Sequence, residues 1–148
     1  MLELVDASRT LDKVTYKRVF PELEIRLGEC QRRVRRANVP VVIVFEGWEA
    51  AGKGTVINRL TQAMDPRGFK VHPVNAPTEE ERMRPWMWRF WRMLPATGTV
   101  GVFDRSWYGR VLAERMSGAV KRVQIAAAFR DILEFERQLV DDGTVLVK

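Results

Sequence analysis

The segment from Gly47 to Thr55, with the sequence GWEAAGKGT, has the residue types and spacing of a phosphate-binding loop. Glycines let successive backbone N–H groups turn inward around phosphate oxygens, and Lys53 adds a full positive charge. A purely structural glycine turn is the alternative interpretation. The residues of this loop that we predict to bind phosphate are Gly47, Ala50, Ala51, Gly52, Lys53, Gly54 and Thr55.

Two carboxylates are candidates for holding a magnesium ion beside this loop. The usual pattern continues after the lysine with a Ser or Thr hydroxyl that binds the metal, but Gly54 stands there and Thr55 comes one residue late. Glu49 lies inside the loop, and Asp104 closes an apolar run that predicts a strand. Because open α/β sheets bind ligands at the carboxyl ends of their strands, we predict a Mg²⁺ site with Glu49 and Asp104 as metal ligands and catalytic residues.

Three arginines follow Asp104 and can bring positive charge to the same sheet edge. Arg105, Arg110 and Arg115 have the chemistry to neutralise the oxygens of a transferring phosphoryl group. We predict that these arginines and Lys53 are catalytic. In the alternative interpretation Asp104 caps the next helix, and the arginines pair with Glu114 and its neighbours.

The segment from Arg82 to Arg92 interleaves arginines with aromatic residues. Such a pattern can stack on nucleic-acid bases, but Trp86 and Phe90 also have the spacing of a helix core, so packing is the preferred interpretation for most of the rings. Arg82 and Arg89 are seven residues apart. We predict that they share one helical face and line an anion-binding channel.

The basic residues are concentrated in one third of the chain. The whole sequence has 25 Lys and Arg against 19 Asp and Glu, for a net charge of +6, whereas residues 82–122 alone hold nine basic and two acidic residues. This concentration predicts a polyanionic partner such as a nucleotide, a phosphate polymer or a nucleic acid. A solvated arginine-rich face is the alternative.

Strands and helices alternate along the core of the chain. The β-branched run from Val41 to Phe45 predicts a strand buried on both faces of a parallel sheet, and an apolar helical face runs from Val56 to Met64 after the loop. Further strands are predicted at residues 69–74, at 100–103 and from 144 onward. This order predicts right-handed crossovers and an open, three-layer α/β sheet.

Residues 1–38 are predicted to form a helical extension of an α/β core at residues 39–148. Apolar residues recur at helical spacing between Lys13 and Arg36, and Pro21 marks a start or a kink of this helix. The apolar positions are Val14, Val19, Leu23, Leu27 and Val34. Because the last predicted strand is cut off at residue 148, we expect a single but incomplete domain.

Two more helices are predicted in the C-terminal half. Ser106 can cap a helix that carries Trp107 and Val111 on its apolar side. A longer helix is predicted near residues 121–141 from a set of apolar residues at helical spacing. That set comprises Phe129, Ile132, Leu133, Phe135, Leu139 and Val140.

Several classes of protein and site are excluded or unsupported. The longest uncharged apolar stretch, from Val39 to Phe45, is too short to span a membrane, and no secretory signal is recognisable. The single cysteine, Cys30, cannot form an internal disulfide, so we expect a cytoplasmic, reducing location. His72 and Cys30 lack the partners of a metal site or a nucleophilic dyad and are interpreted as structural.

Taken together, these motifs resemble the polyphosphate kinase family 2, whose members move phosphoryl groups between inorganic polyphosphate and nucleotides. The resemblance rests on residues 45–54, 76–81, 88–95 and 103–110, together with Glu114-Arg115, and spans nearly the whole chain. The Trp-Arg-Phe-Trp and Trp-Tyr-Gly-Arg sequences within it are most similar to the polyphosphate:AMP phosphotransferase branch.

The resemblance implies a P-loop kinase fold of the thymidylate-kinase-like type, magnesium dependence, and in-line attack by a nucleotide phosphate on the terminal phosphate of the polymer. By the same resemblance, Lys53 and the loop amides hold the donor phosphates. Glu49 and Asp104 hold magnesium and orient the acceptor, while the three arginines clamp charge. The expected partners are inorganic polyphosphate and AMP, ADP or GDP, in a homo-oligomer, with no membrane and no specific nucleic acid.

This sequence departs from the family pattern in two places. The family normally has Asp where Glu49 stands, and a shift of the carboxylate by about 1 Å can reduce the rate roughly a hundredfold. Members also continue past the fourth strand into a lid and a last strand, so we expect phosphate binding with weak or no turnover. The alternatives are a non-catalytic phosphate-binding or oligomerisation domain of a tandem protein, and nucleic-acid binding through the arginine-rich third.

Overall fold

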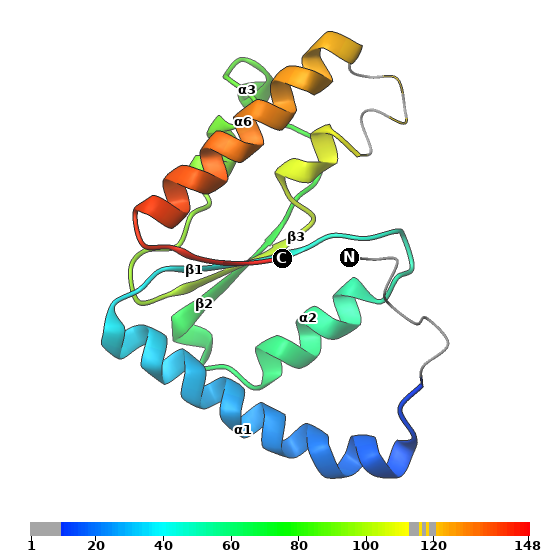
Figure 1. Cartoon of the computed structure of the whole chain (residues 1–148), viewed down its shortest axis with the longest axis vertical. Helices are drawn as coiled ribbons and strands as arrows, with labels where there is room; N and C mark the ends of the chain where they lie inside the picture. Colours follow the sequence, from blue (N-terminus) through cyan, green and yellow to red (C-terminus); the bar gives the residue numbers. More distant parts are fainter. Residues whose placement is uncertain (1–9, 113–115, 117, 119–120) are drawn as a thin grey trace.

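A computed structural model of the chain describes residues 10–112, 116, 118 and 121–148 and contains a parallel four-stranded sheet (Figure 1). The spatial order is β2-β3-β1-β4, and the register pairs Val41 of β1 with Val100 on one side and Val145 on the other. The predicted α/β fold with a parallel sheet is confirmed. The strands are β1 (Val41–Phe45), β2 (Phe69–Pro73), β3 (Val100–Asp104) and β4 (Val145–Val147).

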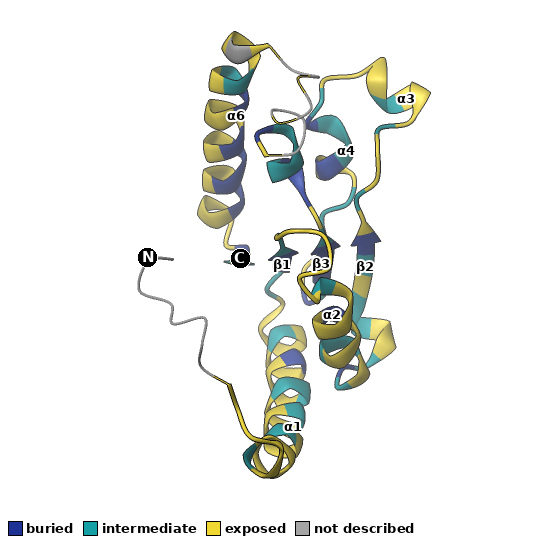
Figure 2. Cartoon of the chain, turned by 90° about the vertical axis from the view of Figure 1, so that its right-hand side faces the viewer, coloured by how far each residue is buried: buried dark blue, intermediate teal, exposed yellow. Residues whose placement is uncertain are grey.

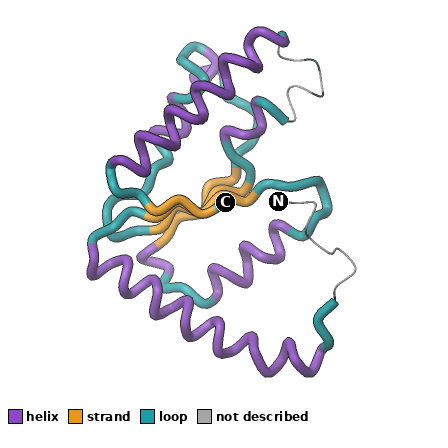
Figure 3. The backbone as a smooth tube through the Cα atoms, viewed as in Figure 1, coloured by secondary structure: helices purple, strands orange, loops and turns teal. Residues whose placement is uncertain are grey.

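Helices cover both faces of this sheet, which gives the three predicted layers (Figures 1 and 3). The helix α6 lies over one face, and α1 and α2 lie over the other. Among the described residues, no helix combines the length and the apolar character that a membrane span requires. The helices are α1 (Lys13–Ala37), α2 (Lys53–Gln62), α3 (Glu79–Arg82), α4 (Trp88–Trp91) and α6 (Arg122–Asp141), with the 3₁₀ helices η2 (Pro66–Gly68) and η3 (Trp107–Arg110).

Each face of the sheet has its own apolar core. On the α6 side, Phe103 and Trp107 are fully buried against Ile132 and its neighbours. On the opposite side, Ile57 and Met64 of the α2 region pack against Val102. The buried residues of α6 face the sheet and the short helices beside it, as Figure 2 shows. Burial of each such side chain stabilises the fold by about 1.5–3 kcal/mol, so both cores support the strand ends that carry the candidate site.

Helix α1 begins before Pro21 rather than at it. The Asp12 carboxylate caps the helix by accepting hydrogen bonds from the backbone N–H groups of Val14 and Thr15, both at 2.9 Å. Pro21 lies inside the helix, so of the two predicted roles a helix start is wrong. The predicted apolar face is only partly used: Leu27 and Val34 pack on the core, whereas Val14, Val19 and Leu23 are exposed.

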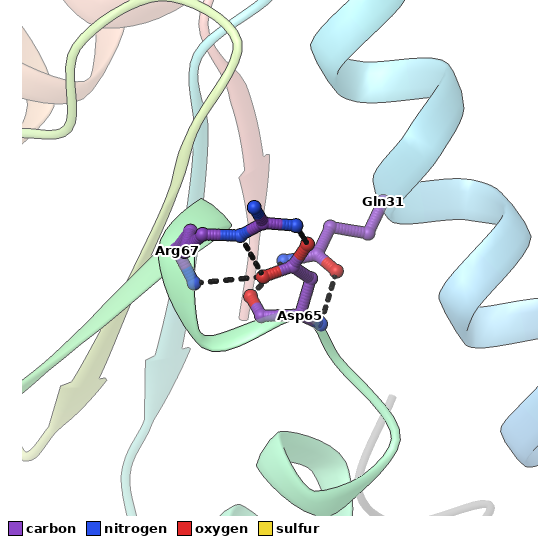
Figure 4. Close-up of polar contacts among 3 residues, drawn as sticks. All are labelled: Gln31, Asp65 and Arg67. Carbon is purple, nitrogen blue, oxygen red and sulfur yellow. Dashed lines mark hydrogen bonds and ion pairs between the residues drawn. The ribbon is translucent and has the colours of Figure 1, made fainter.

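The C-terminal half of α1 is tied to the turn that precedes β2 (Figure 4). The Gln31 side-chain amide donates to the Asp65 carbonyl at 2.9 Å, and its oxygen accepts from the Asp65 backbone N–H at 2.7 Å. The Asp65 carboxylate in turn forms a 2.8 Å ion pair with Arg67. A Cβ at Gly68 would lie only 2.6 Å from the Gln31 amide nitrogen, so any other residue there would displace the Gln31 side chain from this position.

The structure corrects two predictions for the C-terminal half. Ser106 does act as a cap, but of the 3₁₀ helix η3 and not of an α-helix that continues through Val111. The long helix forms as predicted, yet its buried side is only part of the apolar set. Ile132, Phe135 and Leu139 are buried together with Ala128, whereas the predicted residues Phe129, Leu133 and Val140 are exposed.

Candidate functional site

The ends of β1 and β3 bring the two predicted motifs together at the carboxyl edge of the sheet. The parallel register places Phe45 beside Asp104, so the loop after β1 and the turn after β3 start side by side. The Val74 backbone N–H donates to the Asp104 carbonyl at 3.0 Å, which adds the end of β2 to the same edge. The sheet therefore places the phosphate loop, Asp104 and Arg105 around one region, as expected from the sequence.

The phosphate loop has the left-handed backbone that its glycines favour, and Ala50 adopts such a conformation although it carries a side chain. Gly47 has φ = 155°, Ala50 has φ = 62° and Gly52 has φ = 85°, so the chain turns through left-handed conformations before α2 begins at Lys53. The Lys53 ammonium donates to the carbonyls of Gly47 (2.9 Å) and Trp48 (2.8 Å). The lysine is thereby held across the loop, and the N-terminus of the ten-residue helix α2 faces the same space.

A cleft of about 550 Å³ opens beside this loop, and we call it the phosphate cleft. Most of the predicted phosphate-binding residues line it, whereas Gly47 lies outside the lining and contributes through its carbonyl to Lys53. The lining also holds both predicted carboxylates. The residues that line the cleft are Glu49 to Thr55, Pro73, Val74, Asn75, Asp104 and Arg105.

The side chains of the phosphate cleft suit a magnesium ion that protein and substrate bind together better than they suit a metal ion that protein side chains bind alone. Within the described residues, no group of three or more His, Cys, Asp or Glu side chains could hold a metal. Glu49 and Asp104 supply two carboxylates on the wall of the cleft. Mg²⁺ is usually bound by one or two carboxylates together with substrate phosphates and water. Two carboxylates in one cleft wall suit a site of this kind, and the role of Glu49 and Asp104 as magnesium ligands stays a prediction.

A second cleft of about 660 Å³ adjoins the first, and we call it the arginine cleft. The two clefts share Val74, Asn75 and Arg105 in their walls. Five arginines face the arginine cleft beside a single acidic residue, Glu81, and aromatic rings form part of the wall. Its charged and aromatic lining comprises Glu81, Arg82, Arg84, Trp86, Arg89, Phe90, Arg105, Trp107 and Arg110.

Arg82 and Arg89 reach the arginine cleft from two different helices. Arg82 ends α3 and Arg89 lies in α4, so the prediction that they share one helical face is wrong, although both line one cleft. The Arg89 guanidinium lies 3.4 Å from the Glu81 carboxylate, and both side chains are largely buried. Glu81 is itself fixed, because it accepts from the Thr78 backbone N–H at 2.9 Å in a capping box. Arg89 therefore lies in the wall beside a carboxylate whose own position is fixed by the capping box.

Arg105 and Arg110 occupy different positions around the arginine cleft. Arg105 has a left-handed backbone (φ = 64°), an unfavourable conformation for a residue with a side chain, and it lies between the two clefts. The Arg110 guanidinium lies 5.5 Å from the ring centre of Trp86, whose indole N–H donates to Asp131 at 2.9 Å. Arg115, the third predicted arginine, lies outside the described residues.

A buried carboxylate supports the turn that carries Arg110, and sequence patterns gave no signal for it. Glu136 of α6 accepts from the Trp107 indole (3.0 Å), the Tyr108 hydroxyl (2.7 Å) and the Lys148 ammonium (2.8 Å). Burial, and then the hydrogen bond to Glu136, raises the pKa of Tyr108, while Glu136 raises the pKa of Lys148. Glu136 lies 29 residues from Trp107, so helical periodicity could not reveal the contact.

The two residues interpreted as structural have different surroundings. His72 is buried and stacks on Phe103 with 5.0 Å between ring centres. Burial and then the nearby Lys70 charge lower the pKa of His72, which favours the neutral ring expected of a core residue. Cys30 is a free thiol on the exposed side of α1 and has no place in either core.

Comparison with known proteins agrees with this geometry. Residues 10–148 match the family described as polyphosphate kinase 2. The chain is 45% identical over 148 residues to a polyphosphate:AMP phosphotransferase from Pseudomonas aeruginosa and covers 30% of that protein. It is 40% identical over 138 residues to an NDP-polyphosphate phosphotransferase 1 from Ruegeria pomeroyi, covering 93% of this chain and 45% of that one.

A solved structure gives the same result in three dimensions. A crystal structure of a polyphosphate kinase 2 from Arthrobacter aurescens matches the whole chain with a TM-score of 0.93 and 31% sequence identity, and the match covers 56% of that protein. This likeness confirms the expected P-loop kinase fold. The chain spans about a third to a half of the length of these relatives.

Proposed function

This chain belongs to the polyphosphate kinase 2 family, and we propose that it transfers a phosphoryl group between inorganic polyphosphate and a nucleotide. The observation that carries the proposal is that the phosphate cleft and the arginine cleft meet at Arg105 and Asn75. Two polyanions can therefore be held end to end, with Asp104 beside their meeting point. Transfer between two bound phosphates needs this arrangement.

The phosphate cleft is the proposed site of polyphosphate. The loop amides and the N-terminus of α2 favour anions. The Lys53 ammonium, which donates to the Gly47 and Trp48 carbonyls, would turn from them to donate to a bound phosphate. The arginine cleft is the proposed site of the nucleotide, because its volume suits a small ligand and arginines dominate its lining. AMP is the acceptor that the 45% identity to a polyphosphate:AMP phosphotransferase favours, and ADP and GDP are the other candidates.

The proposed reaction is an in-line displacement at the terminal phosphorus of the polymer. A phosphate oxygen of the nucleotide forms the new P–O bond while the bridging P–O bond breaks, and the shortened polyphosphate leaves with the electron pair of that bond. Arg105 and Arg110 are placed to neutralise the oxygens of the transferring group. Glu49 and Asp104 would hold magnesium, which when bound supplies positive charge to the phosphate oxygens.

Location and assembly are also proposals. We propose a cytoplasmic location, which the single free cysteine supports because it forms no internal disulfide. A homo-oligomer is proposed as well. It is supported by the apolar side chains that α1 and α6 expose, such as Leu23 and Leu133.

A non-catalytic phosphate-binding domain is the second candidate function. Glu49 favours it, because a glutamate places its carboxylate about one methylene farther into the phosphate cleft than the aspartate that the family resemblance implies. The chain also spans only 30% of its Pseudomonas aeruginosa relative. Such a domain would bind tripolyphosphate without transferring a phosphoryl group.

The experiment that separates these functions follows ADP formation from AMP, polyphosphate and Mg²⁺. We expect ADP to form slowly, chelation of the metal to stop its formation, and Asp104→Asn to lower the rate roughly a hundredfold further. The Asp141→Asn variant is the control, because Asp141 is exposed at the end of α6 and lies outside the lining of both clefts. Tripolyphosphate binding without ADP, in this chain and in one extended past Lys148, would favour the second candidate.

A further inference from the structure

Two hydrogen bonds join the residues just before the phosphate loop, Phe45 and Glu46, to the first residues of the arginine-bearing turn. The Arg105 backbone N–H donates to the Phe45 carbonyl at 2.9 Å, which extends the pairing of β1 and β3 by one step. One residue farther along, the Ser106 hydroxyl donates to the Glu46 carboxylate at 2.6 Å. Ser106 is almost fully buried, and its oxygen also accepts from the Tyr108 backbone N–H at 3.2 Å. The bond between Ser106 and Glu46 therefore joins the two segments one residue beyond the backbone pairing of β1 and β3.

The presence of a carboxylate at Glu46 is unfavourable for an anion site taken by itself. Glu46 directly precedes Gly47, so its negative charge lies at the base of a loop that binds phosphate. Two negative charges at such a short distance repel one another, so the Glu46 carboxylate should weaken the binding of phosphate in the loop. Among the described residues, the hydrogen-bond partner of this carboxylate is Ser106, a neutral side chain that does not cancel its charge. The benefit of Glu46 must therefore come from position.

We propose that Glu46 is a positioning residue, which through Ser106 holds the phosphate loop at a set distance from Asp104 and Arg105. Glu49 and Lys53 line the phosphate cleft from the segment that follows β1, whereas Asp104 and Arg105 line it from the end of β3 and the turn after it. Without the link, these two segments lose a fixed contact beside the cleft, and the loop can shift relative to Asp104 and Arg105. This inference rests on the proposed function, because it takes the phosphate cleft as the polyphosphate site.

Two neutral variants of Glu46 test the proposal, because charge and position predict opposite results for one of them. Glu46→Gln removes the charge but keeps an oxygen that accepts from Ser106. Glu46→Ala removes both. The measurement is the affinity of the full chain for tripolyphosphate with Mg²⁺, by titration calorimetry. If charge alone mattered, both variants would bind tripolyphosphate more tightly than the unmodified chain.

We expect Glu46→Gln to bind as tightly as the unmodified chain or up to about fivefold more tightly, since one like charge is gone. Glu46→Ala should bind about tenfold more weakly than Glu46→Gln. In a Ser106→Ala background the difference between the two Glu46 variants should disappear, because their shared partner is absent. Ser106→Ala alone should weaken binding, and this result carries the test if Glu46→Ala fails to fold.

Thr99→Ala is the control for loss of a hydroxyl, since Thr99 donates to the Ala96 carbonyl at 2.7 Å at the opposite end of β3. It should leave tripolyphosphate affinity unchanged. Equal affinities of Glu46→Ala and Glu46→Gln, or a difference that persists without Ser106, would overturn the positioning role while the proposed function stands. Failure of the unmodified chain to bind tripolyphosphate would overturn the proposed function, and this inference with it.

Discussion

The two edges of the sheet use polar side chains in different ways. At the amino edge, before β2, the side-chain amide of Gln31 is paired on both sides with the Asp65 backbone, and the Asp65 carboxylate is paired with Arg67. These groups are bonded to one another. At the carboxyl edge, Glu49, Asp104 and Arg105 instead line open clefts.

Backbone conformation follows the same division. Two residues with side chains, Ala50 and Arg105, adopt left-handed φ angles at the carboxyl edge, and each lies in the wall of the phosphate cleft. At the amino edge, within the part of the chain that the structure describes, Asn38 is the non-glycine residue that does so, in the ordinary role of ending α1. The strained backbone conformations therefore lie in the wall of the phosphate cleft, whereas the paired groups of the amino edge stabilise the fold.

The largest expected effect that separates the edges is on phosphate affinity. Lys53→Met removes the one positive charge of the phosphate loop and should weaken tripolyphosphate binding about a hundredfold, because charged hydrogen bonds contribute about 1.5–3 kcal/mol each. Lys70→Met is the matched control, since it removes an equal charge from an exposed position on β2. Titration calorimetry measures both. Equal losses for the two variants would mean that total charge, and not the loop, binds the anion.

Sequence patterns were sufficient for features that depend on neighbouring residues. The β-branched run of β1 and the glycines of the phosphate loop act through local backbone preference, so the sequence alone locates both. The position of Asp104 beside the loop also followed, because parallel strands place their carboxyl ends at one edge. The concentration of basic residues predicted only a polyanionic partner. The family resemblance narrowed that partner to a nucleotide and inorganic polyphosphate.

Features that depend on distant residues were not predictable. Gln31 and Asp65 are 34 residues apart, and Glu46 and Ser106 are 60 apart, so no periodicity links them. The apolar residues Phe129 and Leu133 fit a helical pattern equally well as core or surface, and only the packing of α6 shows that they are exposed. Tertiary hydrogen bonds and the choice of a buried face depend on which elements meet.

A smaller effect should separate the edges by stability. Gln31→Ala leaves the Asp65 backbone N–H without its partner in a half-buried turn, while the Asp65 carbonyl still accepts from the Gly68 backbone N–H at 3.0 Å. The free energy of unfolding should therefore fall by about 1–2 kcal/mol. Tripolyphosphate affinity should not change. Gln62→Ala, at an exposed position at the end of α2, is the control. Urea unfolding measures the first effect and calorimetry the second; weaker phosphate binding in Gln31→Ala would contradict the separation.

The smallest expected effect is a pH dependence confined to the amino edge. The hydrogen bonds and the charge of Arg67 lower the pKa of Asp65 from 3.8 to about 2. Because the pKa is lower in the folded chain, the ionised carboxylate stabilises the fold at pH values above 3.8, and this contribution is lost as the pH falls towards 2.

Asp65→Asn should therefore lower the free energy of unfolding slightly at pH 6. The gap in this free energy between the variant and the unmodified chain should narrow as the pH falls through the range between the two pKa values, 3.8 and about 2. Added salt should narrow it as well, since the ion pair with Arg67 is solvent-exposed. Urea unfolding across this pH range measures the gap. A gap that widens as the pH falls would reverse the sign of the linkage and show that Asp65 is not stabilised as a carboxylate, so the amino edge would lose its role as a closed, paired region.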